Sequence, residues 1–446
     1  PRAICAGPSI FPVAHHMDSA RPPRAWTALC GQARIVSLAA PARSVAAMYV
    51  VLTVELLNMT AYRGARVIVT LFAVDMGVPQ FYIGALAAMF SVFPMMLGLY
   101  AGRLTDRLGV RIPMVGGSVG VGLGLLVPYL FPTLTALYVS AALMGASWVF
   151  YNVCAQNLIG DLSNADTRAK NFSNYGLVMA GGSFAGPMVV GFSIDHLGYP
   201  LSYVVLAAVT LGAALVTTYL RVPPANDKAP SGAETSHSAN LLSDAPLRQT
   251  LITSGIVLTG TDLFQFYMPI YGRSIGLSAS MIGIILGTFA VAAFFVRLVM
   301  PRLVKRYTPD TVLIGSLYMG AAAYVLFPLF ETPVLLAAMA FVLGLGMGCS
   351  QPVSLMLIYD RAPPGRSGEA LGLRLMINNF THIVVPLLFG SLGTAFGVVP
   401  VFIANSAILG AGGILSSRAK AASKRAQPVA HALLADNEPD LQKEKS

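Results

Sequence analysis

The chain contains the same residue pattern twice, at a constant offset of 199 positions. Six glycines between positions 77 and 198 recur at this offset, whereas random placement of 43 Gly in 446 residues would give about one such match. The matched glycines are Gly77 and Gly276, Gly84 and Gly283, Gly116 and Gly315, Gly145 and Gly344, Gly191 and Gly390, and Gly198 and Gly397. A parallel repeat of this length predicts two similar half-domains around one central site.

The composition places this repeat in a membrane, because the chain is 55% hydrophobic and only 11% charged. Apolar stretches long enough to cross a bilayer as helices lie near 45–73, 81–101, 112–131, 134–160, 171–193, 200–220, 249–272, 281–300, 311–330, 333–358, 369–392 and 397–417. Six stretches precede the polar segment at 221–248 and six follow it. The sequence therefore predicts an all-α membrane protein with twelve transmembrane helices in two pseudo-symmetric six-helix bundles.

We expect five segments along the chain. The predicted order is a disordered cytoplasmic N-terminal segment (1–43), a six-helix bundle (44–220), a cytoplasmic linker (221–248), a second six-helix bundle (249–417) and a cytoplasmic C-terminal tail (418–446).

The net charge of +10 follows the predicted topology. Basic residues gather in every second loop and in both tails, which is typical of segments that stay in the cytoplasm. The sequence therefore predicts cytoplasmic termini, a lipid bilayer around the helices and no nucleic-acid partner. The four cysteines have no metal-ligand or redox spacing, so no metal or cofactor is expected.

The loop between the second and third stretches holds Gly102, Asp106, Arg107, Gly109 and Arg111 in the order G-x-L-x-D-R-x-G-x-R. In this loop the chain resembles the major facilitator superfamily of secondary transporters, over residues 45–417. The resemblance implies that the loop stabilises one conformation by joining helices within and between the two halves.

A second motif lies in the fifth stretch, at Gly182, Gly186, Pro187 and Gly191. It is similar to the G-x-x-x-G-P-x-x-G-G motif of drug/proton antiporters in this superfamily, with Val190 in place of one glycine. Its residues could equally serve as an ordinary small-residue helix interface. Ala141 also stands where such antiporters usually carry an arginine, so the resemblance to exporters is incomplete.

Ionisable residues inside predicted spans are candidates for function, because an unpaired charge in hydrocarbon is costly. Glu55, Asp262 and His382 are the proton-coupling candidates, and each could instead have a structural role. Arg63 and Asp262 are repeat-related, so they could meet as an ion pair or find separate partners. The candidates for lining a substrate cavity are Tyr62, Arg63, Arg66, Asn152, Gln156, Gln351, Arg374 and Asn378.

The chain has no phosphate-binding Gly-Lys-Ser/Thr loop and no enzyme constellation. We therefore expect a non-enzymatic, monomeric secondary transporter of a bacterial inner membrane. The first hypothesis is proton-coupled export, by alternating access, of a drug-like compound or a secreted metabolite such as a siderophore. The alternative is proton symport that imports an organic anion, because arginines outnumber acids in the spans. A non-transporting receptor or scaffold would not need buried charges.

Overall fold

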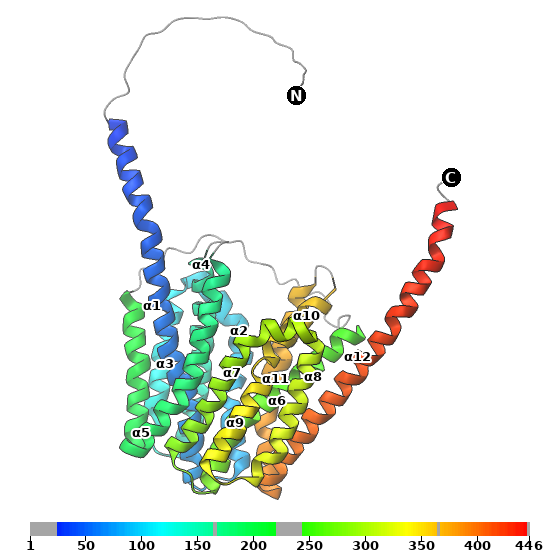
Figure 1. Cartoon of the computed structure of the whole chain (residues 1–446). Helices are drawn as coiled ribbons and strands as arrows, with labels where there is room; N and C mark the ends of the chain where they lie inside the picture. The colour runs from blue at the N-terminus through cyan, green and yellow to red at the C-terminus, as the bar shows by residue number, and fades with distance from the viewer. Residues whose placement is uncertain (1–24, 164–166, 220–242, 364–365, 444–446) are drawn as a thin grey trace, which may run out of the picture. The chain divides into compact units, whose positions relative to one another are not determined.

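The computed structural model describes residues 25–163, 167–219, 243–363 and 366–443. The chain divides into two units between Ala47 and Met48, and the contacts described below lie within the second unit. The helices are α1 (Ala25–Asp75), α2 (Gln80–Leu108), α3 (Arg111–Leu130), α4 (Leu134–Asp161), α5 (Arg168–Tyr219), α6 (Ala245–Ser274), α7 (Ala279–Tyr307), α8 (Pro309–Leu326), α9 (Pro333–Met347), α10 (Ser350–Arg361), α11 (Ser367–Phe396) and α12 (Val398–Lys443) (Figure 1).

These helices make twelve spans, six on each side of the segment 220–242. The long α5 contains two spans, because Gly198 has non-helical angles (φ 75°, ψ 173°) and breaks it. Conversely, α9 and α10 together form one span, Pro333–Arg361. The fold is thus an all-α membrane fold with two six-helix halves, as the sequence predicts.

Within the described part of the chain, nine helical segments are long and apolar enough to cross a membrane, and the two-span α5 counts once among them. The first helices of the two halves, α1 and α6, are not in this group. They carry charged and polar residues inside their spans, including Glu55 and Arg63 on α1 and Asp262 and Gln265 on α6. The two most polar spans are therefore repeat-related, and both contribute to the cavity described below.

The turns confirm the repeat. Among the described residues, every positive φ belongs to a pair separated by 199 positions. The pairs are Gly77 (72°) with Gly276 (80°), Gly109 (74°) with Thr308 (62°), and Gly198 (75°) with Gly397 (84°). The two halves therefore use the same turns. We call the end that carries the turns at Gly77, Gly198, Gly276 and Gly397 the Gly198 end.

Close contacts between the halves explain why glycines and a proline recur. A Cβ on Gly84 of α2 would collide with the carbonyl oxygen of Pro386 on α11, and one on Gly283 of α7 would collide with that of Pro187 on α5. The same holds for Gly191 against Ala279 and for Gly390 against Gln80. Because these residues are repeat-related, α2–α11 and α5–α7 are equivalent interfaces, and each needs glycine to let the backbones approach.

The remaining glycines of the motif in α5 pack against α1. A Cβ on Gly182 would meet the side chain of Met59, and one on Gly186 would meet Arg63 and the carbonyl oxygen of Thr60. This motif therefore sets the spacing of α5 to α1 and, through Pro187 and Gly191, to α7.

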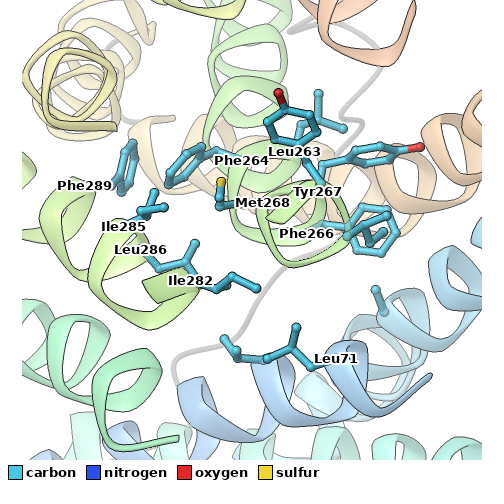
Figure 2. Close-up of a cluster of buried hydrophobic side chains, with 14 of the residues drawn as sticks. Leu71, Leu263, Phe264, Phe266, Tyr267, Met268, Ile282, Ile285, Leu286 and Phe289 are labelled. Atoms are coloured by element: carbon cyan, nitrogen blue, oxygen red, sulfur yellow. The ribbon is translucent and has the colours of Figure 1, made fainter. Parts of the chain in front are cut away.

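Aromatic and aliphatic side chains fill the space between neighbouring helices. Figure 2 shows Phe264 and Met268 of α6 pointing toward Ile285 and Phe289 of α7. The rings of Phe264 and Phe289 have centroids 4.8 Å apart, and all four side chains are buried. This packing holds α6 against α7 next to the polar face of α6.

The helices extend beyond the expected domain boundaries. Residues 25–43, where we expected disorder, are helical, because their alanine-rich sequence favours continuation of α1. At the other end, α12 continues past residue 417 to Lys443. Most of the expected linker, 221–242, and all of 1–24 lie outside the described residues, and the domain boundaries stay predictions.

Candidate functional site

A cavity of about 360 Å³ lies between the two halves. Side chains from α1, α2 and α5 form one wall, and side chains from α6, α7, α10 and α11 form the other. Its polar lining consists of Arg63, Arg66, Thr70, Ser183, Thr261, Asp262, Gln265, Arg297, Gln351, Asn378 and His382. Of the residues predicted from the sequence, Arg63, Arg66, Asp262, Gln351, Asn378 and His382 are thus brought together here.

Asp262 and His382 form a direct pair in this cavity. The Oδ2 atom of Asp262 on α6 contacts Nδ1 of His382 on α11, and the Asp262 side chain is 9% exposed. A carboxylate that faces an imidazole can hold or exchange one proton with it. The sequence marked both residues as proton candidates but gave no sign that they meet, because they lie 120 residues apart.

Of the two alternatives for Arg63 and Asp262, the structure has separate partners and no ion pair between them. Arg63 instead donates from Nη1 to Oε1 of Gln265, at 3.0 Å, and this hydrogen bond joins α1 to α6 across the halves. Gln265 lies three residues after Asp262, on the same side of α6. The repeat fixes the backbone positions of Arg63 and Asp262, but the direction of a side chain depends on its neighbours, and His382 engages the acid.

Two further arginines reach the cavity without an acidic partner. The guanidinium of Arg66 lies 5.9 Å from the centroid of the Phe90 ring. Arg297 donates from Nε to the carbonyl oxygen of Gly348 at 2.8 Å. In the described part of the chain, neither of them nor Arg63 forms an ion pair. The cavity lining therefore holds three guanidinium groups and one carboxylate.

Arg374 is a support for the cavity wall and does not line the cavity. Its Nη2 donates to Oε1 of Gln351 at 2.7 Å and to the Gln351 carbonyl oxygen at 3.3 Å. Gln351 itself lines the cavity, as does Asn378, which lies one turn beyond Arg374 on α11. Arg374 therefore positions Gln351.

Three other cavity candidates lie elsewhere. Tyr62 stacks on Trp148 of α4 with ring centroids 4.2 Å apart, so it is behind the cavity wall. Asn152 accepts from Gln156 at 2.6 Å and donates to the hydroxyl of Tyr175 at 3.4 Å. On α1, Arg63 and Arg66 thus face the cavity, whereas Tyr62 faces α4.

Glu55 lies in the interior of the first half, away from the cavity lining. Its side chain is fully buried, and both carboxyl oxygens lack a hydrogen-bond partner among the described residues. The hydroxyl groups of Tyr151 and Tyr175 are the polar groups near it. Burial of an unpaired carboxylate is costly, so this position favours the neutral acid.

The loop motif is only partly visible. Gly109 provides the turn between α2 and α3, and Arg111 begins α3. The side chain of Asp106 lies outside the described residues, so the expected latch role of Gly102, Asp106 and Arg107 stays a prediction.

Sequence reasoning missed a set of contacts that join the halves at the Gly198 end. Asp75 of α1 pairs with Arg273 of α6 at 2.8 Å and accepts a hydrogen bond from Tyr199. At the start of α7, Asp195 accepts from the backbone N–H groups of Ala279 (3.1 Å) and Ser280 (2.7 Å). These contacts hold the two halves together at this end.

The other interface has the repeat-related contact. The backbone N–H of Phe81, at the start of α2, donates to Oγ1 of Thr394 on α11 at 2.8 Å. Phe81 and Ser280 are related by the 199-residue offset, and so are Asp195 and Thr394. In the sequence, only the 199-residue offset could have indicated that these two contacts occupy equivalent positions.

The chain is similar in sequence and in fold to known membrane proteins. The family model described as the Major Facilitator Superfamily matches residues 51–272 and 250–435. The multidrug resistance protein MdtG of Klebsiella pneumoniae is 24% identical over 74% of this chain and 82% of its own length. The class D tetracycline resistance protein of Salmonella ordonez is 22% identical over 69% of this chain and 79% of its own length. The crystal structure of the nucleoside transporter NupG superposes with a TM-score of 0.70 at 15% identity, covering 83% of this chain and 98% of NupG.

Proposed function

Because the chain belongs to the major facilitator superfamily, and is therefore a multi-pass membrane transporter of small molecules and not an enzyme, we propose that it is a proton-coupled exporter. Its relatives include proteins named for multidrug and tetracycline resistance, and this supports export of a small organic molecule. The basic loops support an inner-membrane protein with both termini in the cytoplasm.

One observation carries the proton coupling, namely the Asp262–His382 pair in a cavity between the halves. A transporter that uses a proton needs a titratable group that both sides of the membrane reach in turn. In the predicted topology the Gly198 end faces outward, and its inter-half contacts hold it closed. Rocking of the halves about the cavity would break these contacts and expose the pair to the outside.

The other side chains of the site have supporting roles in this proposal. The hydrogen bond from Arg63 to Gln265 joins α1 to α6, so it depends on the relative position of the two halves. Arg374 fixes Gln351 in the cavity wall. Binding or release of a proton at Asp262 changes the charge beside these groups. This change alters the relative stability of the inward-open and outward-open forms, and so couples their equilibrium to the occupancy of the cavity.

Transport by everted membrane vesicles tests the proposal. Radiolabelled tetracycline and 4-phenylbutyrate serve as probes, with imposed pH gradients of either sign. We expect accumulation of at least one probe that depends on the protein and responds to the gradient, and no such response in Asp262→Asn. Glu331→Gln, which removes an exposed acid that does not line the cavity, is the matched control. If accumulation of the probes by the wild type does not change with the pH gradient, proton coupling is contradicted.

A further inference from the structure

We propose that the substrate of this cavity is an organic anion with an aromatic or otherwise apolar body, and that it occupies the cavity together with a proton. The inference rests on the proposed function in that it takes the cavity between the halves as the transport site. The charges and the unpartnered donors of the cavity lining carry it.

The fixed charge of the cavity is positive. Arg63, Arg66 and Arg297 contribute three guanidinium groups, which do not titrate in proteins. The single carboxylate of the lining, on Asp262, is already engaged by His382. Because the site lies inside the helical bundle, solvent ions screen these charges weakly. An anion is therefore attracted to this cavity, and a cation is repelled from it.

The lining also offers hydrogen-bond donors that lack partners. Nε of Arg63 and Nε2 of Gln351 are buried and unbonded among the described residues. The Arg66 guanidinium lies beside the face of Phe90, and it has no ion pair within the part of the chain that the structure describes. Carboxylate oxygens accept several hydrogen bonds at once and match guanidinium donors in geometry. A carboxylate, or an anion of similar shape, would satisfy these donors.

The rest of the lining is apolar, and this defines the body of the ligand. Phe90, Phe266 and Phe289 line the cavity together with Met59 and Leu286. Aromatic faces and a methionine accept ring systems without demanding one fixed orientation. The combination of cationic groups and aromatic rings fits an aryl or arylalkyl carboxylate better than a small inorganic anion, which would leave the apolar lining unfilled.

The charge of the substrate also fixes the sign of its linkage to the proton. A proton added to the Asp262–His382 pair makes the cavity more positive and thereby increases its affinity for an anion. By reciprocity, the bound anion increases the proton affinity of the pair. A transporter with this linkage binds the anion and the proton together and releases them together.

Calorimetric titration of the full-length protein in nanodiscs tests the inference with three probes of one skeleton. The probes are 4-phenylbutyrate (anionic), 4-phenylbutyramide (neutral) and 4-phenylbutylamine (cationic). We expect the carboxylate to bind at least about tenfold more tightly than the other two, because truncating one partner of a buried charge pair usually has a larger effect than this. Arg66→Gln and Arg297→Gln should each reduce carboxylate affinity to the level of the amide.

Arg302→Gln is the control, because it removes the same charge at an exposed position outside the cavity, and it should leave all three affinities unchanged. Titration in two buffers of different ionisation enthalpy measures the protons exchanged. Carboxylate binding should take up protons, and Asp262→Asn should abolish this uptake.

The results separate the inference from the proposed function. Binding of the amine as tight as that of the carboxylate would overturn the inference, as would proton release on carboxylate binding. If 4-phenylbutyrate binds as expected but its flux does not change with the pH gradient, the inference stands and the proposed coupling fails. If Asp262-dependent flux of tetracycline is seen without selective binding of the carboxylate, the function stands and the inference fails.

Discussion

The carboxylate of Asp195 accepts a hydrogen bond of 2.7 Å from the backbone N–H of Ser280, and so joins α5 of the first half to α7 of the second. Burial acts against ionisation of Asp195, but hydrogen bonds from Ser280, Ser278 and Ala279 outweigh it and lower the pKa of this carboxyl from its ordinary value. The repeat-related contact uses Thr394, which does not titrate. One of the two equivalent interfaces is therefore sensitive to acid.

Asp195→Ala should favour opening of the Gly198 end, because two N–H groups at the start of α7 lose their acceptor. Spin labels at the exposed positions 197 and 281 report the separation of α5 and α7. We expect a larger population of long distances in the variant. The wild type should show the same shift only as pH falls through the lowered pKa, since the ionised form makes the contact. Thr394→Ala should leave this pair of labels unchanged, and unchanged distances in Asp195→Ala would contradict the role of the carboxylate.

Thr308→Gly should stabilise the protein. Thr308 holds φ 62° and ψ 148°, a conformation that β-branched residues rarely adopt, and its repeat mate is Gly109. Relief of this strain is worth about 1–3 kcal/mol, partly offset by the greater freedom of glycine in the unfolded chain. Thermal unfolding in one detergent measures the effect, and we expect a higher midpoint. Thr311→Gly, inside α8, should lower the midpoint; a lower midpoint for Thr308→Gly as well would refute the strain.

Glu55→Gln should leave stability unchanged or increase it at neutral pH. The amide has the shape of the neutral acid, and no described residue gives an ionised Glu55 a charged partner, since the neighbouring Tyr151 and Tyr175 are neutral. Glu55→Ala should destabilise by about 2–3 kcal/mol because it leaves a cavity in a fully buried site. Thermal unfolding of both variants tests this, and a loss in Glu55→Gln as large as in Glu55→Ala would show that the carboxylate has a charged partner.

The sidedness of the molecule is tested by reporter fusions. A reporter after the loop 103–111, or after residue 425, should be active in the cytoplasm, and one inserted in 194–199 should be active outside, as the distribution of basic residues predicts. The same side for both classes of fusion would exclude the proposed orientation of the Gly198 end.

The loop motif makes a separate prediction about rate. Asp106→Asn should leave the protein folded and inserted but slow transport strongly, because the proposed role of Asp106 is conformational. Flux of a bound probe and expression level are measured together, with Arg302→Gln as a control for the change in surface charge. Wild-type turnover in Asp106→Asn would remove Asp106 from the mechanism.

Much of the fold could be predicted from the sequence, because hydropathy identifies the membrane spans and the 199-residue offset relates equivalent backbone positions in the two halves. Gly84, Gly191 and their mates were visible as recurring glycines, and the structure gives the reason in the α2–α11 and α5–α7 contacts. The boundaries were less predictable, because α1 and α12 continue as helices beyond the apolar stretches.

The kinds of residue that line the site could be predicted from the sequence, but the contacts between their side chains could not. Charged and amide residues inside spans, such as Asp262 and Asn378, do line the cavity. Which side chains meet depends on rotation and tilt of whole helices, so the sequence left open whether Asp262 pairs with Arg63 or finds another partner, and the structure has His382 there. For the same reason Tyr62 was expected in the cavity, whereas its ring stacks on Trp148.

The central claim is that the Asp262–His382 pair carries the coupling proton. Proteoliposomes that contain the purified protein allow two measurements with the same labelled probe, namely exchange at equal pH and net uptake driven by a pH gradient. We expect Asp262→Asn to keep exchange and to lose the response to the gradient, and Glu331→Gln to behave like the wild type in both measurements. Retention of the full gradient response in Asp262→Asn would contradict the claim.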